Sequence, residues 1–376
     1  MAEAAPEEAD RVGDLPHPRE TLRLFGQEAA EEAFLAAWGG GRLHHAWLLA
    51  GPRGVGKATL AYRIARARLA AEEGGGLFGA PEPPRTLDLD PEHPVSRRIA
   101  AGSEPRLFTL RREADPKTER LYTRIRVEDV RRLKSFFQLS AADGGWRVAV
   151  VDPAEEMNAN AANALLKVLE EPPPRVLILL VCHAPARLLP TIRSRCLMLK
   201  LSPLGAEDLA AALEAAGVET GAEAGALALL SDGSAGEAAR LAALGGPALY
   251  SRLVSLLAGA PGMNRREMAA IGSACSGRAN AETYDLVIRL IDILLARLAR
   301  AGALGPPSAE AAPGEAKALA ALSPGPAAAR LWADLALTLG GRAAAARAVN
   351  LDPSQVMLDI FLEIDAAARI ARAREG

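Results

Sequence analysis

Short apolar runs alternate with segments of helical period over the first two hundred residues of the chain. A continuous apolar run such as 176–181 is typical of a strand buried on both faces of a parallel sheet. Runs of this kind predict strands at 46–50, 107–110, 147–151, 176–181 and 196–201. Apolar positions at helical spacing predict helices at 20–38, 58–71, 128–137 and 154–171. The alternation predicts an α/β fold with a parallel sheet of the βαβ type.

Beyond residue 203 the pattern carries no further strand signal. Three short helical segments fill 205–244, and 247–376 is helical except for a Gly/Pro/Ala-rich linker near 302–326. The stretch 72–105, rich in Gly and Pro, is expected to be an irregular surface insertion. The predicted domains are an acidic, disordered tail (1–18), a P-loop nucleotide-binding-like domain (19–202), a small helical domain (203–245) and an all-α domain (246–376).

Composition excludes several classes of protein. The net charge is −2, so no overall field draws the chain to nucleic acid or membrane. Three distant cysteines predict neither a zinc site nor a disulfide framework. The acidic N-terminus and the lack of a long apolar run predict a soluble, cytoplasmic protein. One stretch, 111–134, holds nine Lys or Arg against five Asp or Glu. It is either a solvated helix face or a contact with a phosphate backbone.

The segment 51–57, GPRGVGK, has the spacing of a P-loop and stands between an apolar run and a helix. Its glycines Gly51, Gly54 and Gly56 allow backbone N–H groups to converge on a phosphate, and Lys57 adds a positive charge. The next residue should carry a hydroxyl for Mg²⁺, but it is Ala58. Thr59 is a poor substitute, because it is rotated by about 100° around the helix.

A second part of a nucleotide site follows the run 147–151. Asp152 stands where P-loop ATPases place a carboxylate for the magnesium shell, but Pro153 occupies the position of the water-activating acid. Glu155 and Glu156 are interpreted as the acidic first turn of the next helix. Two parts of the hydrolytic machinery are therefore missing together. Farther along, Arg193 and Arg195 end a helical segment, and at least one of them should point outward.

Three stretches occur in the order and spacing of the bacterial clamp-loader ATPases, and the chain resembles that family. They are GPRGVGKATLA, RVAVVDPAEEMNANAANALLKVLEEPP and LPTIRSRC, with Gly26-Gln27 matching the family's adenine-side entry segment. The resemblance implies an AAA+ core, a helical lid and an all-α C-terminal collar that carries most of the oligomer interface. It also implies that Arg195, in the Ser-Arg-Cys triplet, is an arginine finger that enters the ATP site of a neighbouring subunit.

Compared with the family's motor subunit, gamma/tau, this sequence differs at the residues that would act on ATP bound by the same subunit. Besides Ala58 and Pro153, Gly236 replaces the lid arginine, Cys182-His183 displaces a polar residue after a strand, and no zinc-binding cysteine cluster is present. The resemblance thus implies a part of the DNA polymerase III holoenzyme that is neither a polymerase nor an autonomous ATPase. Gly51, Gly54, Gly56, Lys57, Thr59 and Asp152 would form a degenerate nucleotide site, and whether it binds ATP is left open at this point. No metal is expected.

The implied partners are the gamma/tau and delta subunits and, through the complex, the sliding clamp and primer-template DNA, with no membrane. His183 is interpreted as a capping or surface residue. Two alternatives stay open at this point. One is an active ATPase motor like gamma/tau, and the other is a free-standing nucleotide-sensing P-loop protein.

Overall fold

The computed structural model describes residues 8–11, 15–41, 43–73, 84–118, 120–143, 145–277, 280–349 and 351–373. The chain divides into two compact units, which are Met1–Gly217 with Gly233–Glu237 and Val218–Asp232 with Ala238–Gly376. This division leaves the expected boundaries at 202/203 and 245/246 as predictions.

A five-stranded parallel sheet, in the order β2-β3-β4-β1-β5, forms the centre of the first unit. Its strands are β1 (Ala46–Ala50), β2 (Leu107–Leu110), β3 (Arg147–Val151), β4 (Val176–Cys182) and β5 (Leu197–Lys200). Trp47 on β1 is in register with Leu179 on one side and Leu197 on the other. Strands β1, β3 and β4 are buried at every position, as an unbroken apolar run requires. The predicted parallel α/β sheet is confirmed.

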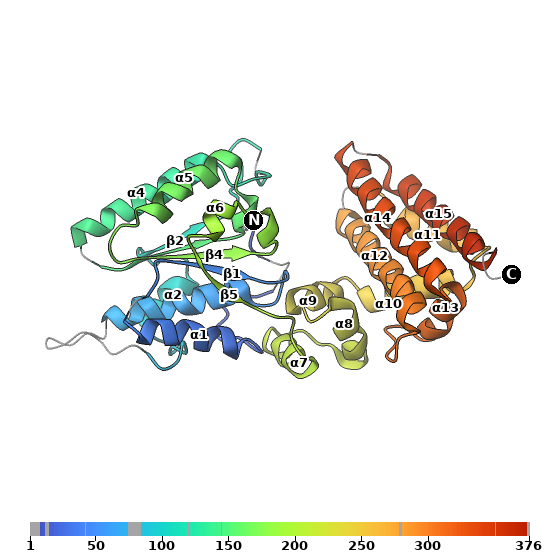
Figure 1. Ribbon diagram of the computed structural model, residues 1–376, viewed down its shortest axis with the longest axis horizontal. Helices are drawn as coiled ribbons and strands as arrows, with labels where there is room; N and C mark the ends of the chain where they lie inside the picture. The colour runs from blue at the N-terminus through green and yellow to red at the C-terminus, as the bar shows by residue number, and fades with distance from the viewer. Residues whose placement is uncertain are drawn as a thin grey trace, which may run out of the picture. The chain divides into compact units, whose positions relative to one another are not determined.

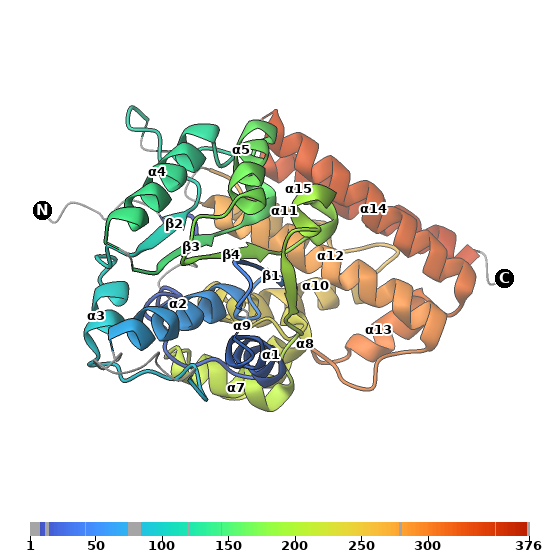
Figure 2. The same ribbon diagram turned by 60° about the vertical axis from the view of Figure 1, so that its left-hand side comes forward.

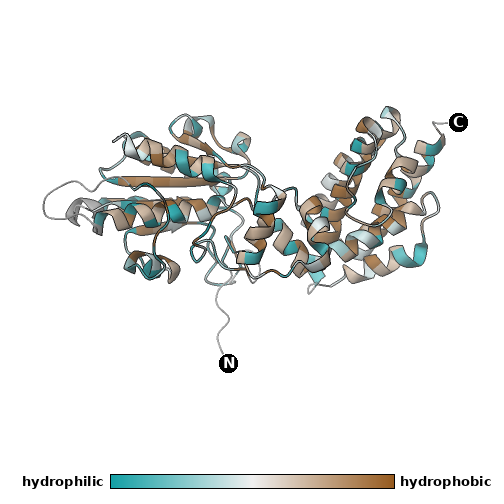
Figure 3. Cartoon of the chain, turned by 90° about the horizontal axis from the view of Figure 1, so that it is seen from below, coloured by the Kyte–Doolittle hydropathy of each residue, from teal (hydrophilic) through white to brown (hydrophobic). Residues whose placement is uncertain are grey.

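Helices cover both faces of this sheet (Figures 1 and 2). One layer is α1 (Glu28–Gly39), α2 (Lys57–Glu73) and α3 (Pro94–Ala100), and the other is α4 (Val127–Asp143), α5 (Ala159–Glu170) and α6 (Pro190–Arg193). Because side chains alternate along a strand, Leu49 joins the core under α1 and α2, whereas Leu48 joins the core under α4 and α5. The hydropathy colouring shows the hydrophobic sheet between the two layers (Figure 3).

Two helix predictions extend too far toward the N-terminus. The helix expected over 20–38 begins only at Glu28, because the carbonyls of Thr21 and Leu22 accept hydrogen bonds from arginines of α2. The helix expected over 154–171 is interrupted as well. Ala154–Glu156 form a 3₁₀ turn, and α5 starts after Asn158, whose side chain accepts a 2.8 Å hydrogen bond from the Ala161 N–H.

The insertion expected over 72–105 is not wholly irregular. It contains α3, which is capped by His93, whose Nδ1 accepts a hydrogen bond from the Val95 N–H. Pro94 at the first helical position favours the start of this helix. The centre of the insertion, 74–83, lies outside the described residues.

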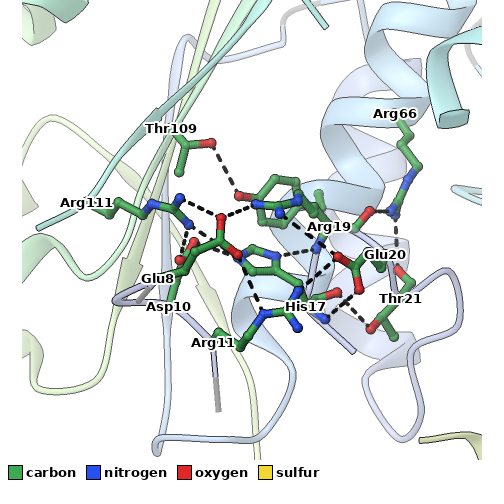
Figure 4. Close-up of polar contacts among 11 residues, drawn as sticks. Glu8, Asp10, Arg11, His17, Arg19, Glu20, Thr21, Arg66, Thr109 and Arg111 are labelled. Carbon is green, nitrogen blue, oxygen red and sulfur yellow. Dashed lines mark hydrogen bonds and ion pairs between the residues drawn. The ribbon is translucent and has the colours of Figure 1, made fainter. Parts of the chain in front are cut away.

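The disorder expected over 1–18 does not extend to the described residues 8–11 and 15–18. Arg111 Nη2 lies 2.8 Å from Glu8 Oε1, and Arg111 Nη1 also contacts Asp10. His17 is buried with its Nε2 atom 3.1 Å from Asp10 (Figure 4). Burial alone would raise the pKa of Glu8, but hydrogen bonds from Arg19 and Arg111 lower it to about 2. Residues 1–7 and 12–14 lie outside the described part of the chain.

The segment after the sheet forms three short helices, as the sequence predicts. They are α7 (Ala206–Ala215), α8 (Ala224–Ser231) and α9 (Ala235–Ala243). Helix α7 and the first residues of α9 belong to the first unit, whereas α8 and the rest of α9 belong to the second.

The second unit contains helices and, within its described residues, no strand. After α8 and α9 it consists of α10 (Gly246–Ala258), α11 (Arg265–Ala274), α12 (Ala281–Leu304), α13 (Glu315–Leu322), α14 (Pro326–Ala348) and α15 (Pro353–Ala373). Helix α13 lies inside the stretch expected to be a linker. Glu315, fully buried, accepts a 2.7 Å hydrogen bond from the Tyr250 hydroxyl and pairs with Arg297, which anchors α13. The all-α C-terminal region is confirmed.

Among the described residues, no single helix is both long and apolar enough to cross a membrane. One sharply bent pair, Ala235–Ala243 with Gly246–Ala258, meets that test by length and composition.

Candidate functional site

The P-loop runs from the carboxyl end of β1 into the first turn of α2. Gly54 and Gly56 have φ angles of 78° and 99°, in the left-handed region that glycine adopts at low cost. A Cβ at Gly51 would overlap the carbonyl of Leu201, and one at Gly56 would overlap the Leu24 side chain. The loop therefore has the backbone that its sequence predicts, and it is packed closely against its surroundings.

Lys57 is turned back onto its own loop. Its Nζ donates a 2.8 Å hydrogen bond to the carbonyl of Gly51 and a second one to the carbonyl of Pro52. Only 3% of the residue is exposed. Burial lowers the pKa of Lys57 to about 8, although the carboxylates of Asp152 and Glu155 oppose that shift.

Asp152 follows β3 and lies near Lys57, as the sequence predicts for parallel strands whose carboxyl ends share one edge. Burial, reinforced by the Asp10 carboxylate, raises the pKa of Asp152 to about 7, despite the nearby Lys57. A carboxyl group with this pKa is partly protonated near neutral pH, which weakens it as a magnesium ligand.

Two further residues, Glu155 and His183, lie near Lys57 although the sequence predicts other roles for them. Glu155, interpreted as the acid of a helix start, lies on the 3₁₀ turn, and its Oε1 accepts a 2.8 Å hydrogen bond from the His183 N–H. Glu155 Oε2 and His183 Nδ1 are buried and have no hydrogen-bond partner among the described residues. Burial and Lys57 lower the pKa of His183, which keeps its ring neutral. The sequence feature that could have identified Glu155 as part of this site is its position three residues after Asp152.

The tip of the P-loop contacts the segment that begins α9. The Gly236 N–H donates a 3.1 Å hydrogen bond to the carbonyl of Gly54. Ser234 accepts a 3.1 Å hydrogen bond from the Glu237 N–H, and its Oγ would overlap any Cβ at Gly54. Gly236, which stands where the family's motor carries an arginine, thus packs its backbone directly on the loop.

These residues do not fit magnesium-ATP as they are arranged. Ala58 offers no hydroxyl, Lys57 donates to its own loop, and Asp152 has a raised pKa. Within the described ranges, no cluster of three or more His, Cys, Asp or Glu side chains is arranged to hold a metal ion. Thr59 is partly buried on α2.

Arg195 lies at the surface, just after α6. Its Nη1 donates a 3.0 Å hydrogen bond to the carbonyl of Thr191 and lies 3.5 Å from Ser194 Oγ. Its Nη2 lies 2.8 Å from Oε1 of Glu170, the last residue of α5. The Arg195 side chain is 37% exposed, so its guanidinium is accessible. The structure therefore brings Lys57 and Asp152 together but leaves Arg195 outside that cluster.

Most arginines of the basic stretch 111–134 are paired within the chain. Arg112 contacts Glu156, Arg126 contacts Asp129, and Arg132 contacts both Glu113 and Asp129. These pairs neutralise much of the local positive charge, which favours the interpretation of this stretch as a solvated surface.

A surface pocket of about 360 Å³ lies between α4 and α5 and contains no P-loop residue. Its lining is formed by Lys134, Phe137, Gln138, Lys167, Val168, Glu170, Glu171 and Pro173.

Comparison with known proteins shows which family this site is similar to. Residues 26–205 match the family model described as DNA polymerase III, delta subunit. This match spans just under half of the chain. The delta-subunit family segment contains every predicted site residue, from the P-loop to Arg195, and it ends before α7.

Similar proteins agree with this family. DNA polymerase III subunit delta' of Pseudomonas aeruginosa is 41% identical over 167 residues, which are 44% of this chain and 46% of that protein. The delta' subunit of Bacillus subtilis is 31% identical over 43% of this chain and 44% of that protein. The DNA polymerase III gamma subunit of Buchnera aphidicola is 30% identical over 51% of this chain and 47% of that protein. The chain thus spans about half the length of these relatives.

Among solved structures, a gamma subunit-related protein from Thermotoga maritima is 18% identical and superposes with a TM-score of 0.40. That alignment covers 89% of this chain and 99% of the other chain. A similarity this low adds nothing to the fold described above.

Proposed function

We propose that this protein is the delta-prime subunit of a bacterial DNA polymerase III clamp loader. It helps to load the sliding clamp onto primed DNA, and it supplies Arg195 in trans to a neighbouring ATPase subunit without hydrolysing ATP itself. One contrast carries the proposal. The Arg195 guanidinium is exposed at the surface, whereas Lys57 is buried on its own loop beside Ala58.

The chemistry of an arginine finger supports the role given to Arg195. A guanidinium has five N–H donors in a planar fork, so it can contact two oxygens of a phosphate at once. Charge develops on the γ-phosphoryl oxygens in the transition state, and an arginine supplied in trans contributes about 10³–10⁵ to the rate. The ATP in question is bound by the neighbouring subunit.

The rest of the chain receives its roles from the same family. Residues 19–202 form the AAA+ core, 203–245 the lid and 246–376 the collar, which carries most of the interface with the gamma/tau and delta subunits. Contacts with the sliding clamp and with primer-template DNA are made through the complex. The protein works in the cytoplasm, away from membranes.

The test is the DNA-stimulated ATPase of the complete clamp loader, reconstituted with its own partner subunits. Arg195→Ala should lower the rate by at least tenfold while the complex still assembles, because the transition state loses a charge contact. Arg195→Lys should restore little, since an ammonium group cannot form the bidentate contact. Arg193→Ala, in the same turn, is the matched control and should leave the rate unchanged. An unchanged rate with Arg195→Ala would refute the proposed role.

The two alternatives from the sequence predict other outcomes. An active motor like gamma/tau would hydrolyse ATP as the isolated chain, which Ala58 and Pro153 oppose. A free-standing nucleotide sensor would fail to co-purify with clamp-loader subunits. An ATPase assay of the isolated chain tests the first alternative, and affinity purification followed by mass spectrometry tests the second.

A further inference from the structure

The ion pair between Glu170 and Arg195 joins the end of α5 to the turn that carries the proposed finger. We propose that Glu170 is a positioning residue, which holds the Arg195 guanidinium in the orientation needed to reach the neighbouring subunit's phosphate. The inference rests on the proposed function of Arg195, and it adds a second residue of this chain to that reaction.

The contacts of Arg195 leave part of its fork available. Nη1 contacts the carbonyl of Thr191 and Ser194 Oγ, and Nη2 lies 2.8 Å from Oε1 of Glu170. Among the described residues, the Nε–H group of Arg195 has no hydrogen-bond acceptor. Nε and Nη2 form one edge of the guanidinium, and such an edge can make bidentate contacts with phosphate. The contacts with Glu170 and Thr191 therefore restrict the orientation of the guanidinium while its side chain stays 37% exposed.

The position of Glu170 is unfavourable for α5 itself. A helix C-terminus carries a partial negative charge, so a carboxylate there is destabilising. Glu170 ends α5, and Glu171 follows as its cap residue, so two acids stand where basic residues are preferred. Local rules of this kind are broken most often at functional sites. Arg195 supplies the opposite charge that offsets Glu170.

The Glu170–Arg195 ion pair is partly exposed to solvent, so it can orient the Arg195 side chain without fixing it in one position. The side chains of Glu170 and Arg195 are 47% and 37% exposed, so the attraction between them is screened by water. Such a pair narrows the range of side-chain positions that Arg195 samples. The rest of the guanidinium stays accessible to a phosphate, which offers several acceptor oxygens.

The test uses the reconstituted clamp loader and its DNA-stimulated ATPase. Glu170→Ala should lower kcat about twofold to fivefold, the range expected from an exposed ion pair, and should leave the KM for ATP unchanged. Glu170→Gln keeps a hydrogen-bond acceptor and should restore part of the rate. Glu171→Ala removes the neighbouring exposed acid and is the matched control, with no expected change. Thermal unfolding of each variant chain checks that the fold is retained.

A second background separates this inference from the proposed function. In an Arg195→Ala complex, adding Glu170→Ala should cause no further loss, because the group that it positions is gone. A further loss there would refute the inference, and so would an unchanged or increased rate with Glu170→Ala alone. If Arg195→Ala lowers the rate and Glu170→Ala does not, only the role of Glu170 fails. If Arg195→Ala has no effect, the proposed function itself fails.

Discussion

The Gly236 N–H donates a 3.1 Å hydrogen bond to the carbonyl of Gly54, so the start of α9 rests on the tip of the P-loop. This contact depends on two glycines. An added Cβ on Gly54 would lie 3.2 Å from the α-carbon of Gly236, and one on Gly236 would lie 3.1 Å from the α-carbon of Gly54. The loop that would surround phosphates in an active ATPase is here covered by backbone from a distant part of the chain.

We therefore expect Gly54→Ala to destabilise the first unit. Gly54 has a φ of 78°, and an alanine Cβ would also overlap Ser234 Oγ. Gly217→Ala is the matched control, because Gly217 has a φ of 73° and open space around its Cβ position. The control should cost about 1 kcal/mol of unfolding free energy from backbone strain, and Gly54→Ala should cost more. Equal losses in denaturant unfolding would contradict the contact.

The isolated chain should not bind magnesium-ATP tightly. Lys57 donates to the carbonyls of Gly51 and Pro52, and Ala58 provides no metal ligand. Since a ligand that binds the native state raises its stability, millimolar magnesium-ATP should leave the melting temperature unchanged. Isothermal titration should show no saturable heat. An ATP-dependent rise in melting temperature that disappears in Lys57→Ala would contradict this prediction.

Asp365→Ala should destabilise the helical unit. The Asp365 carboxylate accepts hydrogen bonds from the N–H groups of Gly262 (2.6 Å) and Met263 (3.0 Å), and the residue is buried. Removing it leaves two backbone donors without their acceptor, which costs about 1–3 kcal/mol. Asp359 lies on the same helix as Asp365 and forms an exposed ion pair with Arg342 of α14, so Asp359→Ala should cost at most about 1 kcal/mol. Calorimetry measures both, and similar losses would refute the prediction.

The N-terminal ion pairs should make stability depend on acid pH. The pKa of Glu8 is lowered from 4.5 to about 2 in the folded protein, so its carboxylate stabilises the fold above about 4.5. That contribution is lost as the pH falls toward about 2. Glu8→Gln should therefore cost about 1 kcal/mol or less at neutral pH, because the group is partly exposed, and nothing near pH 2. A difference that grows on acidification would contradict the assigned contacts with Arg19 and Arg111.

Much of the first unit was predictable from local pattern. The unbroken run 176–181 predicts a buried central strand, and β4 is buried along its whole length. The glycines of the P-loop predict its backbone, because positive φ angles at Gly54 and Gly56 need residues without a side chain. The start of α1 was not predictable in this way. The helical pattern over 20–27 gives way to hydrogen bonds from Arg63 and Arg66, which lie forty residues away along the chain.

The sequence by itself determined the strands, the P-loop and the loss of the hydroxyl at Ala58, because each depends on residues that are neighbours along the chain. Only the tertiary structure decided that Glu155 lies near Lys57, that the Gly236 N–H meets the Gly54 carbonyl and that Glu170 pairs with Arg195. These pairs come from segments that meet only after the sheet has assembled. The direction in which a carboxylate or an ammonium group points is then decided by the charges and carbonyls that the fold places beside it.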